Sequence, residues 1–330
     1  MGRKGASLKL HARQIRSLWS LIILTIVLVL LPFFVGHYIL HIMIFIFLSA
    51  YLSQCWNILG GFTGQFSLGN AAFFGIGAYT SSLLFLHLQW SPWIGMFIGA
   101  IIALLLGLFV GYLSFHFGLK GPYFALATLA FSEILRILFL NFSAVGGARG
   151  ILIPLKGDAP HLFQFIEKDW FYYISLIMMI FSCMVAYWIE KSRTGYYFKA
   201  ICQNEEAAEA LGIHTKGYKI YATSITAFLT AFGGTFYSQY FMYIEPDLTF
   251  GIFVSFDMIL RCTIGGIGTI AGPIVGSFLI TPLGEVTRIF FGEKSGVHLV
   301  IYSVTLIFVC LFMPRGVYPW IKRSFSRITS

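Results

Sequence analysis

The sequence predicts an all-α polytopic membrane protein with about 8–10 transmembrane helices and Gly-rich segments that are broken or re-entrant. Of the 330 residues, 58% are hydrophobic and only 11% are charged, whereas a globular domain is about 25% charged. The mean hydropathy is +0.83. The apolar residues form runs of about 20, the length of a helix that spans a bilayer. These observations exclude an ordinary soluble domain.

The net charge of +9 does not indicate a nucleic-acid partner, because the basic residues are interspersed between apolar runs. Such a distribution is typical of membrane proteins, where Lys and Arg set the orientation. The five cysteines are odd in number and show no C-x-x-C spacing, so we expect neither a disulfide framework nor a metal site.

The chain divides into five parts. A basic N-terminal tail (1–17) precedes a first transmembrane half (18–190), whose apolar runs lie at about 18–35, 38–59, 70–88, 94–117, 123–142 and 171–189. A polar segment (191–219) leads to a second half (220–313), with runs at about 220–243, 252–264, 274–291 and 297–313, and then to a basic C-terminal tail (314–330). The run at 252–264 is too short to cross a bilayer unaided.

The distribution of Lys and Arg predicts the orientation. With the N-terminus inside, fifteen Lys and Arg lie in the tails and inner loops and four in the outer loops. Because cytoplasmic loops carry the excess of basic residues, both termini and the segment 191–219 are expected in the cytoplasm.

The segment 191–219 contains a short helix with clear end signals. Asn204 can cap its N-terminus, Glu205 and Glu206 occupy the first turn, and Gly212 follows its last residue. A helix of about two turns is not stable alone in water. We therefore expect it to dock on another surface.

Two Gly-rich breaks interrupt the apolar sequence, one in each half. Such breaks in transporters present half-helix ends and free backbone groups to a substrate, but glycine also permits close helix crossing without any such role. Both interpretations stay open. The candidate substrate-pathway residues are Gly64, Gln65, Ser67, Gly69 and Asn70 in the first break, and Gly265, Gly266 and Gly268 in the second.

Charged residues inside the predicted spans occur in couples at helical spacing. These couples are Glu133 with Arg136, Asp257 with Arg261, and Glu285 with Arg288. Spacings of i,i+3 and i,i+4 place each couple on one helix face, which favours internal neutralisation over a role in translocation.

No motif nominates a catalytic residue. The sequence has no G-x-x-x-x-G-K-[ST] phosphate loop, no H-E-x-x-H and no G-x-S-x-G. A transport role therefore comes first, with an ATP-independent carrier or channel and a membrane-embedded enzyme as the alternatives.

Three stretches and the closing MPRG resemble one family. GQFSLGNAAFFGIGAYTSSLL (64–84), EEAAEALGIHTKGYKIYA (205–222) and GGIGTIAGPIVGS (265–277) are similar to the LivM-type permease of branched-chain amino acid ABC transporters. The resemblance implies an importer subunit of the bacterial inner membrane that moves branched-chain or related hydrophobic amino acids by alternating access.

The resemblance also implies partners. These are a LivH-like second permease subunit, two cytoplasmic ABC ATPase subunits that carry the ATP and Mg, and a periplasmic or extracellular substrate-binding protein, besides membrane lipid. The family's coupling helix corresponds here to Asn204, Glu205, Glu206, Ala207, Ala208, Glu209 and Gly212. No cofactor is expected on this chain.

Two departures from the family pattern are visible. The hydrophobic second half of the coupling motif is missing, since Tyr221-Ala222-Thr223-Ser224 stands near its place. The first break usually ends in His where this chain has Asn70, and an amide keeps hydrogen bonding without titrating near neutral pH. Related permeases carry urea or short amides, so these substrates are the alternative to branched-chain amino acids.

Overall fold

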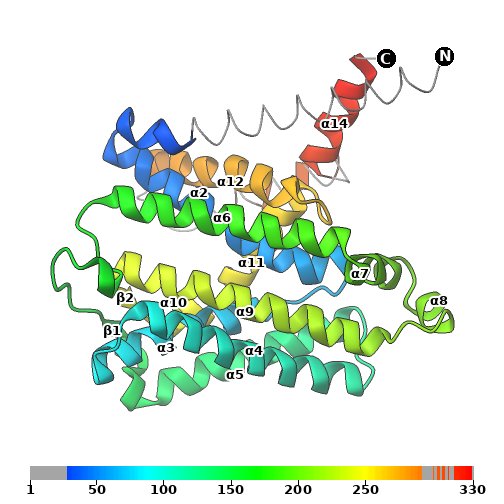
Figure 1. The fold of residues 1–330 in the computed structure, drawn as a ribbon, viewed down its shortest axis with the longest axis horizontal. Helices are drawn as coiled ribbons and strands as arrows, with labels where there is room; N and C mark the ends of the chain where they lie inside the picture. The colour runs from blue at the N-terminus through cyan, green and yellow to red at the C-terminus, as the bar shows by residue number, and fades with distance from the viewer. Residues whose placement is uncertain are drawn as a thin grey trace.

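The computed structural model describes residues 28–291 and 316–328, and positions 300, 303, 304, 307, 308 and 311 between them. This part of the protein is an elongated bundle of long helices, which confirms the predicted all-α membrane class (Figure 1). The long helices are α2 (His37–Asn57), α3 (Asn70–Leu88), α4 (Pro92–His116), α5 (Pro122–Asn141), α6 (Lys168–Lys191), α9 (Thr215–Phe241), α11 (Ile252–Gly265) and α12 (Ala271–Phe291).

Shorter elements join them. They are η1 (Leu31–Phe33), the π-helical turn η2 (Ile58–Phe62), η3 (Ser143–Val145), η4 (Gly147–Arg149), η5 (Pro160–Leu162), α7 (Arg193–Gln203), α8 (Glu205–Ala210), α10 (Pro246–Phe250) and α14 (Val317–Ile328). Two two-residue strands, β1 (Ile151–Leu152) and β2 (Tyr243–Ile244), pair antiparallel.

Six segments of the described chain are long and apolar enough to cross a membrane. They are His37–Phe62, Asn70–Leu88, Pro92–His116, Pro122–Asn141, Lys168–Lys191 and Pro246–Gly265. The run at 252–264 is too short to cross a bilayer unaided, and the sixth segment is longer because α10 precedes α11 in it. The runs predicted at 18–35 and 297–313 fall largely outside the described residues.

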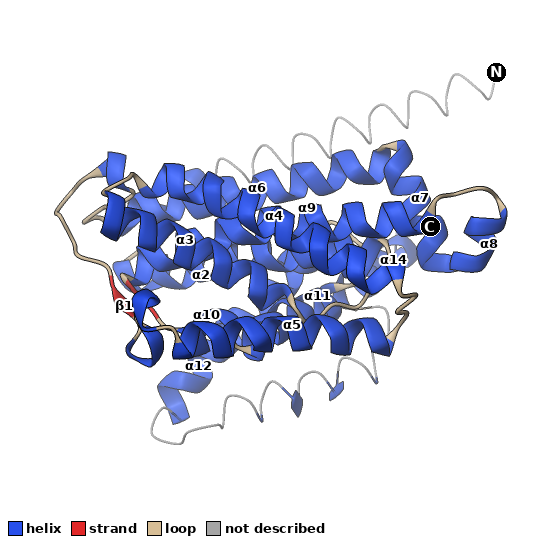
Figure 2. Cartoon of the chain, turned by 90° about the horizontal axis from the view of Figure 1, so that it is seen from below, coloured by secondary structure: helices blue, strands red, loops and turns tan. Residues whose placement is uncertain are grey.

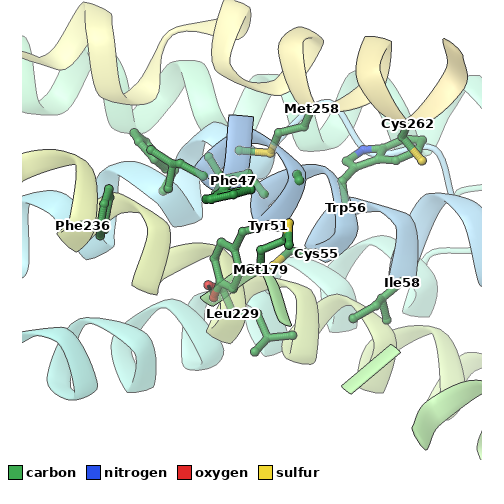
Figure 3. Close-up of a cluster of buried hydrophobic side chains, with 14 of the residues drawn as sticks. Phe47, Tyr51, Cys55, Trp56, Ile58, Met179, Leu229, Phe236, Met258 and Cys262 are labelled. Carbon is green, nitrogen blue, oxygen red and sulfur yellow. Dashed lines mark hydrogen bonds between the residues drawn. The ribbon is translucent and has the colours of Figure 1, made fainter. Parts of the chain in front are cut away.

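Helix α2 lies at the centre of the hydrophobic core. Its side chains Phe47, Tyr51 and Trp56 are buried, and residues of α6, α9 and α11 converge on them (Figure 3). The Tyr51 hydroxyl donates to the carbonyl of Leu229 on α9 at 2.5 Å. Within a bilayer, close packing of these large side chains and hydrogen bonds between helices hold the bundle together.

Helix α9 packs closely because its interior face is small and polar. A Cβ added to Gly234 would lie 1.9 Å from the carbonyl oxygen of Phe74, and one added to Gly77 would lie 2.0 Å from that of Ala231. The backbones of α3 and α9 therefore approach as closely as small residues allow. The Thr235 hydroxyl donates to the Gly77 carbonyl at 3.0 Å across the same contact.

The two ends of the bundle differ. Helices α7, α8 and α14 lie at one end, with α8 protruding furthest, and the β1–β2 pair lies at the other (Figures 1 and 2). The segment 191–219 thus holds two helices before α9. Sequence inspection predicted α8 and missed α7, whose start is capped by the Ser192 side chain accepting from the Gly195 N–H.

Candidate functional site

The first glycine break begins as a widened helical turn. After Asn57 the chain continues as η2, a π-helical turn of five residues, and then runs irregularly to Asn70, where α3 begins. Within this stretch Gly64 has φ +70°, a conformation that glycine adopts without strain. Because π-helical turns often mark functional sites in membrane and soluble helices, the break is the first candidate for the pathway.

The two breaks meet in space at Asn57. Its Oδ1 accepts the N–H of Gly268 at 2.9 Å, and its Nδ2 donates to the carbonyl of Thr269 at 3.0 Å. The Cys262 thiol also donates to Oδ1 at 3.3 Å. One buried carboxamide therefore joins segments about two hundred residues apart in the chain. Asn57 was not among the predicted residues, although a polar residue directly before the glycines was a visible signal.

The glycines of this junction are required by close backbone approach. A Cβ on Gly61 would lie 1.9 Å from Asn57 Oδ1 and 2.7 Å from the Gly268 nitrogen. In the second break Gly266 has φ +129° and Gly268 has φ +73°, and a Cβ on Gly265 would lie 1.7 Å from the Gly272 carbonyl oxygen. These contacts favour the packing interpretation for the glycines themselves.

The polar side chains of the first break have partly unused hydrogen-bonding capacity. The Ser67 hydroxyl donates to Asn70 Oδ1 at 3.1 Å, and Trp56 Nε1 donates to the Ser67 carbonyl at 2.8 Å. Asn70 is fully buried, and its Nδ2 has no hydrogen-bond partner among the described residues. Gln65 is 9% exposed, and its side chain donates to the Thr63 carbonyl at 3.3 Å, its one hydrogen bond within the described part of the chain. A buried amide donor without a partner is a group that a polar solute can satisfy.

The same holds one turn back on α2. Gln54 is fully buried, and neither of its amide atoms has a partner among the described residues. Ser53 Oγ is in the same state. The polar groups of the candidate pathway therefore continue from the break along α2.

The charged residues within the spans are paired. Arg136 contacts Glu133, and it also contacts Asp247 on α10, which sequence inspection did not include. Arg261 contacts Asp257. Arg136 lowers the cost of placing Glu133 in the membrane by neutralising it. Of the third predicted couple, the Arg288 side chain lies outside the described residues.

Helix α8 has both predicted ends. The Asn204 side chain accepts the Ala207 N–H at 3.0 Å. At the other end Gly212, with φ +84°, donates to Glu209 at 2.9 Å and Ile213 donates to Ala208 at 3.1 Å, which is a Schellman motif. Ala208 is buried, whereas the side chain of Glu206 is 88% exposed and Leu211 is 83% exposed.

A buried ion pair anchors α8 to the bundle. Lys219, in the first turns of α9, places its Nζ 2.7 Å from Glu205 Oε1, and its side chain is only 3% exposed. The same ammonium lies 4.5 Å from the ring centre of Phe115 at the end of α4. Lys219 contributes only to the count of basic residues in the sequence, so nothing in the sequence pattern distinguished it.

Helix α7 contacts the first break. A Cβ on Gly64 would lie 3.1 Å from the Cys202 sulfur and 3.4 Å from its Cα. Partial burial raises the pKa of the Cys202 thiol. The first break therefore extends to the end of the bundle that carries α7 and α8, so a displacement of α7 would reach Gly64 directly.

Comparison with known proteins places the chain in a family. The family model described as "Branched-chain amino acid transport system / permease component" matches residues 38–310. The chain belongs to this permease family. The matched range includes both glycine breaks and the segment 191–219, which confirms the predicted resemblance to LivM-type permeases.

Individual relatives agree with the family. The chain is 27% identical over 286 residues to the high-affinity branched-chain amino acid transport system permease protein LivM of Escherichia coli, and 26% identical to LivM of Salmonella typhimurium. Each alignment covers 80% of this chain and 66% of the relative, so the chain spans just under two thirds of their length.

A second kind of relative is also similar. The chain is 29% identical over 203 residues to the autoinducer 2 import system permease protein LsrC of Yersinia enterocolitica, covering 58% of this chain and 53% of that protein. No solved structure matches the chain.

Proposed function

We propose that this chain is the permease subunit of an ABC importer that moves branched-chain amino acids, or related hydrophobic amino acids, into the cell by alternating access. The observation that carries the proposal is the family match over residues 38–310. The LivM relatives favour branched-chain amino acids as substrates. In this proposal ATP and Mg bind to two separate cytoplasmic ATPase subunits, and a second permease subunit and an external substrate-binding protein complete the system.

The shape of the α7–α8 end supports a docking role for α8. Helix α8 is too short to be stable alone, and here it is capped at both ends and pinned through Glu205 to Lys219. It presents Glu206 and Leu211 outward at the tip of the protein. In the proposed orientation this end is cytoplasmic, as the excess of Lys and Arg on that side predicts, and α8 docks in a groove of an ATPase subunit.

A path for coupling runs from α8 to the breaks. A movement of α8 would displace α9 through the Glu205–Lys219 ion pair. It would also displace α7, because Asn204 alone separates the two helices in the chain. Helix α7 contacts Gly64, and Asn57 links that break to the second one. We propose that ATP binding by the ATPases reorients the helices around this junction.

Competition in the assembled transporter tests the substrate. Uptake of radiolabelled leucine is expected to be inhibited by isoleucine and valine, and not by urea, acetamide or autoinducer 2. Inhibition by urea or acetamide, or by autoinducer 2 alone, would reject the amino-acid assignment.

Two substitutions in the first break test the pathway. Gln65→Ala and Asn70→Ala are expected to change uptake per molecule more than they change expression. Lower expression with unchanged uptake per molecule would leave the break with a packing role alone.

A further inference from the structure

One face of the bundle exposes charged side chains within its membrane-spanning segments. This charged face is formed by α5, α10 and α11, and its charged members are Glu133, Arg136, Asp247 and Asp257. Their side chains are 43%, 25%, 60% and 43% exposed. All four lie in the segments Pro122–Asn141 and Pro246–Gly265, which are long and apolar enough to span the membrane.

Two other exposed helices differ from this face. Helix α4 contains no Asp, Glu, Lys or Arg, and exposes Ile94, Ile101 and Leu105. Helix α6 carries its charges only near its ends and exposes Ile177 and Phe181 between them. These surfaces suit lipid, whereas exposed carboxylates at membrane depth are costly in hydrocarbon. The charged face is therefore less suited to lipid than these two helices are.

Open water does not suit the charged face either. Phe253 on α11 is 66% exposed, and Ile134 and Leu138 on α5 are 52% and 57% exposed. These large side chains flank the carboxylates along the same helices. A surface that combines exposed apolar anchors with charged groups is typical of a contact between proteins.

The charge of the face argues against a second copy of this chain. Among the described residues, its three carboxylates are paired with two guanidiniums, those of Arg136 and Arg261, which leaves one negative charge in excess on each copy. A two-fold contact brings the same patch together with itself. It would therefore place an excess of negative charge against an equal excess in a low-dielectric environment, where repulsion is strong.

We propose that the α5–α10–α11 face is covered by a different membrane-spanning chain, which presents a cationic or hydrogen-bond-donating group to Asp247 and Asp257. The inference rests on the proposed function, because the second permease subunit of that proposal would be the chain that covers the face. The first break contacts the inner side of two helices of this face, because Leu68 N–H donates to Thr128 of α5 at 3.1 Å and Ala71 N–H donates to Ser255 of α11 at 2.9 Å.

Spin-label accessibility in the assembled transporter tests the proposal. Nitroxides are attached to Phe253→Cys and Ile134→Cys, with Ile101→Cys on α4 as the matched control, each in a variant whose native cysteines are replaced. The complex is purified through a tag on this chain and placed in lipid nanodiscs. Collision rates are then measured with oxygen, which partitions into lipid, and with a water-soluble nickel chelate.

The labels at 253 and 134 are expected to collide several-fold less with oxygen than the label at 101, and to be protected from the nickel chelate as well. An oxygen collision rate equal to that of the control would place the face in lipid and overturn the proposal. Access to the nickel chelate would place it in open water and also overturn it.

Dipolar spectroscopy on the same singly labelled samples separates a different chain from a second copy. No short distance between two labels at position 253 is expected, and a short distance would overturn the proposal in favour of a pair of identical chains. These measurements need no transport. Failure of uptake would therefore reject the proposed function without changing them, and an exposed face in a working transporter would reject only this inference.

Discussion

Substituting the two partners of the Glu205–Lys219 ion pair one at a time is expected to lower the free energy of unfolding by unequal amounts. The Lys219 side chain is 3% exposed and that of Glu205 is 18% exposed. Glu205→Gln leaves the ammonium buried without a counter-charge, which is expected to cost about 3–5 kcal/mol of unfolding free energy. Lys219→Met leaves a carboxylate that can turn towards water and keeps an apolar contact with Phe115. Its expected cost is about 1.5 kcal/mol, the net worth of one charge-assisted hydrogen bond.

The double variant completes the cycle. Replacing a buried ion pair by uncharged groups of similar volume is close to neutral, so Glu205→Gln with Lys219→Met is expected within about 1 kcal/mol of the wild type. The assay is unfolding of the purified chain by titration of denaturing detergent into mild micelles. Equal losses in the two single variants that simply add in the double variant would refute a buried, coupled pair.

Three further predictions follow from the same structure. Gly212→Pro removes the N–H donated to Glu209 and cannot adopt φ +84°, so ATP hydrolysis is expected to continue without uptake. The control Gly212→Asn tolerates this conformation and is expected to retain uptake. Equal uptake in both variants, or normal coupling after charge reversal at Glu206, would contradict the coupling role of α8. Asn57→Ala removes both hydrogen bonds to the second break and is expected to lower thermal stability and uptake together. The control Asn141→Ala, at the exposed end of α5, is expected to change neither. An unaffected Asn57→Ala variant would show that Asn57 does not stabilise the junction of the two breaks. Because partial burial raises the pKa of the Cys202 thiol, its labelling by an impermeant maleimide is expected to be slow near pH 7 and to become about tenfold faster per pH unit below that pKa. Labelling is expected from the cytoplasmic side only. Labelling of intact cells from outside would contradict the proposed orientation of the chain.

Much of the fold could be predicted from the sequence because the signals were local. Hydropathy and length gave the helices, and the ends of α8 follow from Asn204 and Gly212, whose side-chain and backbone properties act within one turn. Helix α7 was missed because its sequence, RTGYYFKAICQ, contains few aliphatic residues between its charged and aromatic ones. It therefore resembles a polar loop in sequence.

The contacts between distant segments could not be predicted. Nothing in the local sequence says that the carboxamide of Asn57 meets Gly268, or that Asp247 joins the pair of Glu133 and Arg136. The glycine breaks were found, but their meeting depends on how α2 packs against α11 and α12. In the same way, Lys219 became significant only when the fold buried it beside Glu205 and Phe115.

The energy source of transport tests the central claim most directly. The chain is reconstituted into vesicles with its second permease subunit and the external binding protein, with and without the two ATPase subunits, and leucine uptake is measured. The account predicts uptake only when the ATPase subunits and ATP are both present, and no response to an imposed ion gradient. Uptake driven by an ion gradient in vesicles that lack the ATPases would contradict it.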